Sequence, residues 1–191
     1  MKNYIDKALE HSINAKKVTV AENKKKIIEA VDLIINTFNA QNKLLVCGNG
    51  GSACDSLHIC GEFTNRLLKE RRPLAAIPLN SDVASLTAIA NDYSFDKVFS
   101  KQVEAFGKKD DLLWVLTTSG NSKNILEAAK SARSIGMKVF SFSGGDGGNI
   151  IKLSDLFIVA KDKICSRIQE THSFLYHVII EMVEEKMFGE L

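Results

Sequence analysis

Apolar residues recur at helical spacing through the first forty positions of the chain. Few helix-breaking residues interrupt residues 3–40, and Val20, Ile27, Val31 and Ile34 follow the repeat of an amphipathic helix. The pattern predicts one or two helices ahead of the rest of the fold. Their apolar stripe needs a covering surface, and a partner subunit would serve as well as the chain's own core.

Beyond residue 40, short apolar runs alternate with helical stretches. Strands are predicted at 43–47, 74–79, 111–116, 138–143 and 156–160. Helices are predicted at 52–68, 82–91, 95–106, 122–135 and 167–186, with Ser81 as the cap of the second. This alternation predicts an α/β fold, a five-stranded parallel sheet flanked by helices in a three-layer, Rossmann-like sandwich. We expect residues 1–40 to be an N-terminal helical extension and residues 41–191 to be one domain.

Ligands of such folds bind at the carboxyl ends of the strands. That rule places four loops at the functional rim, namely residues 48–52, 80–92, 117–122 and 144–148.

Composition narrows the class of protein. The chain has 191 residues, of which 45% are hydrophobic and 25% charged, as in an ordinary globular domain. The net charge of +2 gives no reason to expect a nucleic-acid partner. There is no membrane-length apolar run and no signal-peptide pattern, and none of the four cysteines forms a C-x-x-C pair. We therefore expect a cytoplasmic protein with reduced thiols and no membrane partner.

Two of the rim loops are rich in glycine and hydroxyl groups. Residues 48–52 read Gly-Asn-Gly-Gly-Ser, and residues 117–122 read Thr-Thr-Ser-Gly-Asn-Ser. Glycine lets the backbone approach a ligand closely, and the free N–H groups of a following helix attract anions. One such loop is as often a purely structural turn, but two at matching positions favour a phosphate site.

A nucleotide site is the competing interpretation of the first loop. Gly48, Gly50 and Ala53 nominally match a dinucleotide-binding fingerprint, which also needs an acidic residue at the end of the second strand. Asn80 stands there instead, so a dinucleotide-dependent oxidoreductase is disfavoured. No Walker A sequence occurs.

Four polar residues on two predicted helices are candidates for chemistry. His58 and Glu62 are four residues apart and share a helix face, while Gln169 and His177 lie on the last helix. The simpler interpretation of His58 and Glu62 is an ordinary surface pair, and that of His177 is a buried core residue. The core interpretation applies to His172 as well. Spacing alone assigns none of them a role.

These residues together resemble a known family. The chain carries, in order, the loop at 48–52, His58-x-x-x-Glu62, Asn91-Asp92, residues 118–122, the Arg-Ile-Gln-Glu run at 167–170, and His177. It resembles the phosphoheptose isomerases of the sugar isomerase (SIS) domain superfamily over nearly its whole length. The loops mark the superfamily, and the combination of His58, Glu62, Gln169 and His177 marks the isomerase.

The resemblance implies a reaction and a site. An aldose–ketose isomerase would convert D-sedoheptulose 7-phosphate to D-glycero-D-manno-heptose 7-phosphate, the first step toward heptose for bacterial surface polysaccharide. Glu62 would be the base and His177 the acid in transfer through an enediol. One zinc ion per subunit would be held by His58, Glu62, Gln169 and His177, in a homotetramer. The implied substrate contacts are Asn49, Gly50, Gly51, Ser52, Glu62, Asn91, Asp92, Thr117, Thr118, Ser119, Ser122 and Gln169.

The spacing of two implied ligands raises a geometric problem. Eight residues of continuous helix would separate Gln169 from His177 by about 12 Å, too far for one metal ion. Either the last helix begins after Gln169, or a neighbouring chain supplies one ligand at a subunit interface.

The alternative function is that of a non-catalytic member of the superfamily. Phosphosugar sensors and a DnaA-binding protein share the two loops, so the loops do not discriminate. Glu62 together with His177 favours the enzyme, because a protein-binding surface needs neither residue.

Overall fold

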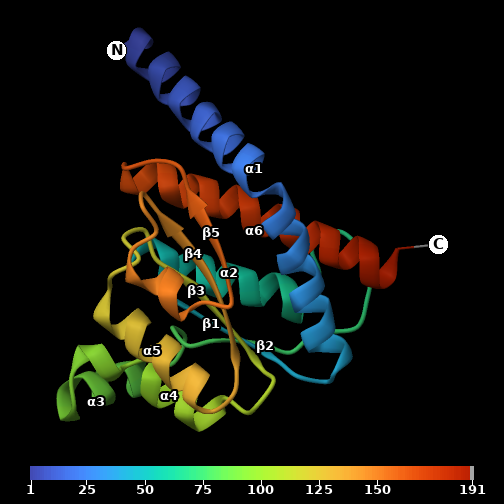
Figure 1. Cartoon of the computed structure of the whole chain (residues 1–191), viewed down its shortest axis with the longest axis vertical. Helices are drawn as coiled ribbons and strands as arrows, with labels where there is room; N and C mark the ends of the chain where they lie inside the picture. The colour runs from blue at the N-terminus through green and yellow to red at the C-terminus, as the bar shows by residue number, and fades with distance from the viewer. Residues whose placement is uncertain (190–191) are drawn as a thin grey trace.

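The computed structural model describes residues 1–189 and contains a five-stranded, fully parallel sheet (Figure 1). Its strand order is β2-β1-β3-β4-β5, and every pairing is parallel. The strands are β1 (Leu44–Gly48), β2 (Ala76–Pro78), β3 (Leu112–Leu116), β4 (Lys138–Gly144) and β5 (Leu156–Ala160). Every residue of β1 and β3 is buried, as expected where helices cover both faces of a sheet. Pro78, which cannot donate a ladder hydrogen bond, lies on the edge strand. The predicted fold class is confirmed.

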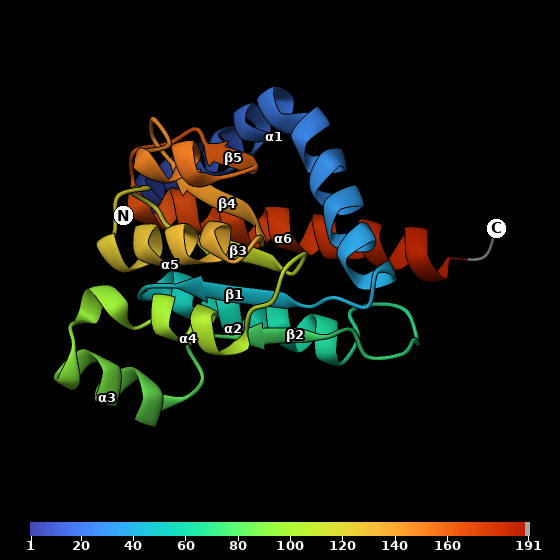
Figure 2. The same cartoon turned by 60° about the horizontal axis from the view of Figure 1, so that its bottom comes forward.

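Six α-helices form the outer layers (Figure 2). They are α1 (Lys2–Asn39), α2 (Gly51–Thr64), α3 (Val83–Asp92), α4 (Ser100–Phe106), α5 (Lys123–Ser134) and α6 (Cys165–Phe188), with short 3-10 turns at Phe95–Lys97 and Asn149–Leu153. One apolar core joins the sheet to α1, α2 and α6, and the other joins it to α4 and α5. No helix within residues 1–189 is long and apolar enough to cross a membrane.

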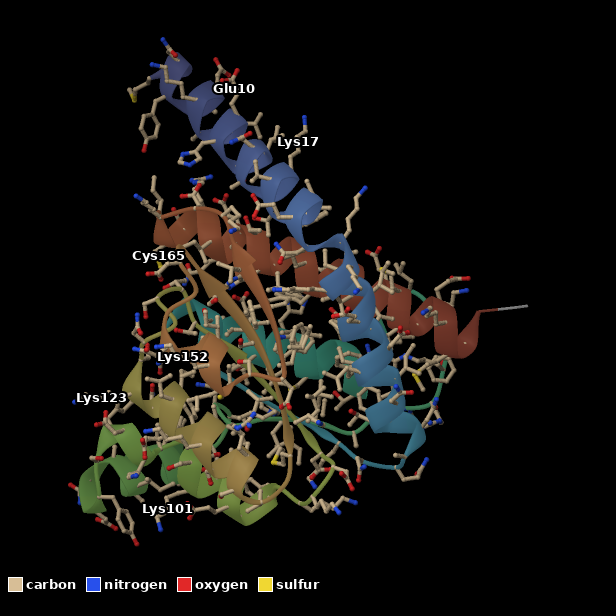
Figure 3. All side chains as sticks on the ribbon, viewed as in Figure 1. Glu10, Lys17, Lys101, Lys123, Lys152 and Cys165 are labelled. Carbon is tan, nitrogen blue, oxygen red and sulfur yellow. The ribbon has the colours of Figure 1, made fainter. Side chains whose placement is uncertain are left out.

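The N-terminal segment is a single helix that contacts its own chain through α6 and β5. Its N-terminal half extends beyond the start of α6 (Figure 1). There the contacts to the rest of the chain include polar ones: the Ser12 hydroxyl donates to Glu170 at 2.6 Å, and His11 lies 2.6 Å from Asp162. Glu10 and Lys17 lie on the same projecting half (Figure 3). The division at residue 40 into an extension and a domain remains a prediction.

Helix α2 ends four residues earlier than predicted. It was expected to reach residue 68 but stops at Thr64. The buried Arg71 guanidinium donates to the backbone carbonyls of Glu62 and Phe63, which caps the helix. The buried Glu184 carboxylate accepts hydrogen bonds from the N–H groups of residues 67–69 and from Arg71. This ion pair joins segments far apart in sequence. Because residues 67–69 donate their N–H groups to Glu184, they do not continue the helix.

Three further helix predictions need correction. Asp82, not Ser81, caps α3, because its carboxylate accepts from the N–H groups of Ala84 and Ser85. The helix predicted at 95–106 is two pieces, separated by residues 98 and 99, which are buried in the core. Helix α6 begins at Cys165, ahead of Gln169.

Candidate functional site

A pocket of about 250 Å³ lies between the loop after β1 and the loop after β3. Gly50 adopts a φ of 55°, a conformation that glycine tolerates, and precedes the first residue of α2. At Gly51 a Cβ atom would meet the Gln169 side chain at 2.6 Å, so glycine allows α6 to approach the loop. The pocket is lined by Asn49, Gly50, Gly51, Ser52, Leu116, Thr117, Thr118, Ser122, Cys165 and Gln169. Nearly all the predicted substrate contacts in the two loops therefore meet in one place.

Two asparagines hold these loops, and the sequence did not reveal either role. Asn124 is buried and exchanges two side-chain amide hydrogen bonds with Asn49, at 2.8 and 2.9 Å. Asn80 accepts from the Gly48 N–H and donates to the Gly48 carbonyl. Asn80 is the residue that stands in place of the acid of a dinucleotide site, and here it anchors the backbone of the first loop.

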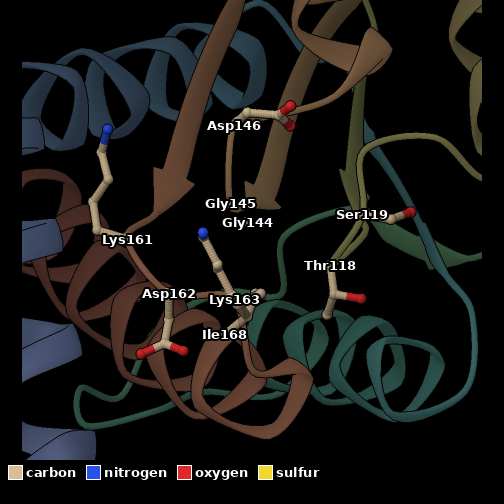
Figure 4. Close-up of a pocket in the computed structure, with 9 residues that line it drawn as sticks. All are labelled: Thr118, Ser119, Gly144, Gly145, Asp146, Lys161, Asp162, Lys163 and Ile168. Carbon is tan, nitrogen blue, oxygen red and sulfur yellow. The ribbon is translucent and has the colours of Figure 1, made fainter.

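A larger cavity of about 730 Å³ lies on the other side of the second loop (Figure 4). Ser119 lines this cavity rather than the smaller pocket, and Thr118 lines both. Gly144 at the end of β4 and the following residues Gly145 and Asp146 form another wall. The smaller pocket suits an anion better, because the N-terminus of α2, the positive end of its helix dipole, lines it.

A second polar centre is formed by His58 and Glu62 on α2 with His177 on α6. One ligand atom from each of these three side chains lies within 4.8 Å of the other two. His58 Nε2 is 3.0 Å from Glu62 Oε1. We call these three residues the His–Glu–His cluster. The structure thus joins three of the four residues that mark the isomerase.

The cluster has the donor set of a zinc site. His177 donates its Nδ1 proton to the Ser173 carbonyl at 2.8 Å, because a carbonyl can only accept. Its Nε2 lone pair is then free for a metal ion. Imidazole nitrogen and carboxylate oxygen are normal zinc ligands, so the residues fit the ion.

Gln169 lies apart from this cluster. It packs against Gly51 at the start of α2, whereas the next part of α6 contacts His58, so α2 and α6 run side by side in the same direction. Both residues belong to one continuous helix, which separates Gln169 from His177 by about 12 Å. The alternative that α6 begins after Gln169 is therefore wrong.

His172 belongs to the core, in line with the simpler interpretation. It is fully buried and donates through Nε2 to the Ser143 carbonyl at 3.0 Å. Burial lowers the pKa of His172 to about 4, so the ring is neutral. It therefore offers no proton to the site.

Asn91 and Asp92 lie at the end of α3 and are exposed. The Asn91 amide donates to the Asp92 carboxylate at 2.9 Å. Neither lines the pocket of the two loops. Their predicted contact with substrate stays a prediction.

The chain is similar to a family of known proteins. The SIS domain family model matches residues 8–144. The chain is 46% identical over 156 residues to the phosphoheptose isomerase of Helicobacter pylori strain P12, which covers 82% of this chain and 81% of that one. It is 40% identical over 192 residues to the Clostridium acetobutylicum phosphoheptose isomerase, covering 100% and 98% of the two chains.

A solved structure supports the same family assignment. A phosphoheptose isomerase from Francisella tularensis superimposes with a TM-score of 0.92 at 36% identity, over 96% of this chain and 97% of the other. The chain therefore belongs to the SIS-domain family and, within it, to the phosphoheptose isomerases.

Proposed function

We propose that the chain is an aldose–ketose isomerase that converts D-sedoheptulose 7-phosphate to D-glycero-D-manno-heptose 7-phosphate. One observation carries the proposal: a carboxylate and an imidazole, Glu62 and His177, share a cluster on α2 and α6, and residues near the N-termini of these two helices help to line the pocket of the two loops. The pocket binds the phosphate, and the cluster acts on the other end of the sugar.

The chemistry moves one proton between neighbouring carbons. The Glu62 carboxylate removes a proton from C1 of the ketose, and the electron pair forms the C1–C2 double bond of an enediol. His177 gives a proton to the C2 oxygen as the carbonyl opens and takes one from the C1 oxygen as the new carbonyl forms. Glu62 then returns its proton to C2. No oxidant or reductant is required.

We also propose one zinc ion per subunit, held by His58, Glu62, His177 and a Gln169 side chain. Bound there, the ion would polarise the sugar oxygens as a Lewis acid. Ligation and acid catalysis by His177 both use Nε2, since Nδ1 is bonded to Ser173. Activity that survives chelation would favour the acid role, and activity that is lost would favour the ligand role.

The active site is proposed to be completed between subunits of a homotetramer. Gln169 is too far from its own chain's cluster, so a neighbouring chain would supply that ligand. The exposure of the region supports this: 47% of the His58 side chain is exposed, and the apolar Leu57 and Phe174 nearby are 43% and 41% exposed. A second chain would cover them.

The projecting half of α1 supports the same assembly. Ile5, Leu9 and Ile13 recur every four residues and are exposed, although the opposite side of the helix makes polar contacts to the chain. An apolar helix stripe of this kind is typical of a subunit contact. Leu9→Glu should shift the protein from tetramer to smaller species in sedimentation velocity. A tetramer that persists would remove α1 from the proposed interface.

We place the enzyme in the cytoplasm, at the first step of heptose synthesis for surface polysaccharide. The alternative is a phosphosugar-binding or DnaA-binding protein without activity. An assay of the metal-loaded and chelator-treated protein with sedoheptulose 7-phosphate distinguishes the two. Turnover is expected, whereas tight phosphosugar binding with no turnover would establish the alternative.

A further inference from the structure

Tyr176 lies directly behind the metal-binding face of the His–Glu–His cluster. It is 2% exposed, and its ring packs edge-on to His58 at 5.5 Å and against His177 at 4.5 Å. Its hydroxyl lies 2.9 Å from His58 Nδ1, the ring nitrogen on the opposite side from Glu62. Tyr176 thus contacts both histidines of the cluster without offering a ligand atom itself.

The protons around this hydroxyl can be assigned from its neighbours. A phenol has one proton to donate and two lone pairs that accept. The Ser173 hydroxyl donates to Tyr176 at 3.3 Å. An ion bound beside Glu62 would take the lone pair of His58 Nε2, which leaves Nδ1 as the protonated nitrogen in need of an acceptor. Tyr176 is that acceptor.

We propose that Tyr176 is a positioning residue, which fixes the orientation and tautomer of His58 for metal binding through the hydrogen bond at His58 Nδ1. This inference rests on the proposed metal site. Groups behind a metal-bound histidine set its orientation and basicity, and their loss typically costs about 10–100-fold in metal affinity. The sequence did not suggest this role, since Tyr176 is one aromatic among apolar residues of α6 and His58 is 118 residues before it.

The test is the zinc affinity of the metal-free protein, measured by competition with a chromogenic chelator. Tyr176→Phe keeps the buried ring and removes only the hydroxyl, and we expect its zinc affinity to fall about 10–100-fold. At saturating zinc its turnover should recover to near the wild-type value, because Tyr176 does not touch the substrate. Thr37→Val, which removes a buried hydroxyl bonded to Leu33 at a distance from the site, should bind zinc like the wild type.

A second variant keeps the test informative if Tyr176→Phe fails to fold. Ser173→Ala leaves Tyr176 in place and removes the hydroxyl that donates to it at 3.3 Å, so the zinc affinity should fall by a smaller factor. Wild-type zinc affinity in both variants would overturn the positioning role of Tyr176 alone. Failure of the wild type to bind zinc would overturn the metal site on which that role rests. Tyr176→Phe that binds zinc normally but loses turnover at saturating zinc would also contradict a positioning role.

Discussion

The pocket between the two loops and the His–Glu–His cluster are built in opposite ways. The pocket uses consecutive residues, 48–52 and 117–122, each at the end of a strand and the start of a helix. The cluster uses single side chains from α2 and α6, which are more than a hundred residues apart in sequence and meet only because the helices pack side by side. Local sequence encodes the pocket, whereas tertiary packing creates the cluster. Binding and catalysis should therefore be separable by mutation.

The largest separation is expected for Glu62→Gln. Turnover should fall about 10²–10⁴-fold, because the amide cannot take the proton from C1. Substrate binding, measured by calorimetry on the metal-loaded protein, should stay within a few-fold since the pocket is intact. The control variant is Glu104→Gln, which changes an exposed carboxylate on α4, and its turnover should equal that of the wild type. A Glu62→Gln enzyme with normal turnover would remove Glu62 as the base.

The buried His172 of α6 should make the stability of the protein depend on pH. The folded-state pKa of His172 is about 4, below its ordinary 6.5, so between these values the unfolded chain binds more protons. Its contribution to stability is complete above pH 6.5 and is lost as the pH falls toward 4, by on the order of 3 kcal/mol. Urea unfolding of the metal-free protein across this range should show a smaller pH dependence for His172→Gln than for the wild type. Equal slopes would show that His172 does not titrate this way.

A more modest effect is expected when the pocket is narrowed. In Gly51→Ala the added Cβ would lie 2.6 Å from Gln169 Nε2 and displace that side chain. Substrate affinity should weaken about tenfold, comparable to the loss of one hydrogen bond. Gly61→Ala on the same helix is the matched control, because a Cβ there meets no atom within 4 Å. If both variants bind alike, close approach at Gly51 is not what shapes the pocket.

The smallest effect concerns α3, which belongs to neither region. Asp82→Ala removes the N-cap and should cost about 1 kcal/mol, or a Tm lower by about 2–4 °C. Ser81→Ala should leave the Tm nearly unchanged, since the Ser81 hydroxyl bonds only to the Pro78 carbonyl. Scanning calorimetry on the two variants decides which residue caps the helix.

The sheet and the two loops could be predicted from the sequence because their signals are local. Apolar runs and glycine-rich turns mark strand ends without reference to distant residues. The end of α2 was not predictable, because the Arg71–Glu184 pair that sets it joins segments 113 residues apart. The same limit concealed the contacts of Asn124 and Tyr176, which depend on partners elsewhere in the fold.

The resemblance, rather than the spacing, predicted the residues of the cluster. His58, Glu62 and His177 were open to simpler interpretations as surface or core residues, and packing distinguishes them from His172. The position of Gln169 within one chain does not account for its implied role as a metal ligand. Gln169 lines the pocket, as the resemblance implies for a substrate contact, but it lies apart from the cluster, although the resemblance also makes it a metal ligand.

Mixing two inactive variants tests the central claim that the active site is shared between subunits. Glu62→Gln and Gln169→Ala should each be nearly inactive alone. When their subunits exchange, some sites combine an intact cluster from one chain with an intact Gln169 from another. Random assortment predicts recovery of about a quarter of wild-type activity. Absence of recovery in demonstrably mixed oligomers would show that each chain builds its site alone.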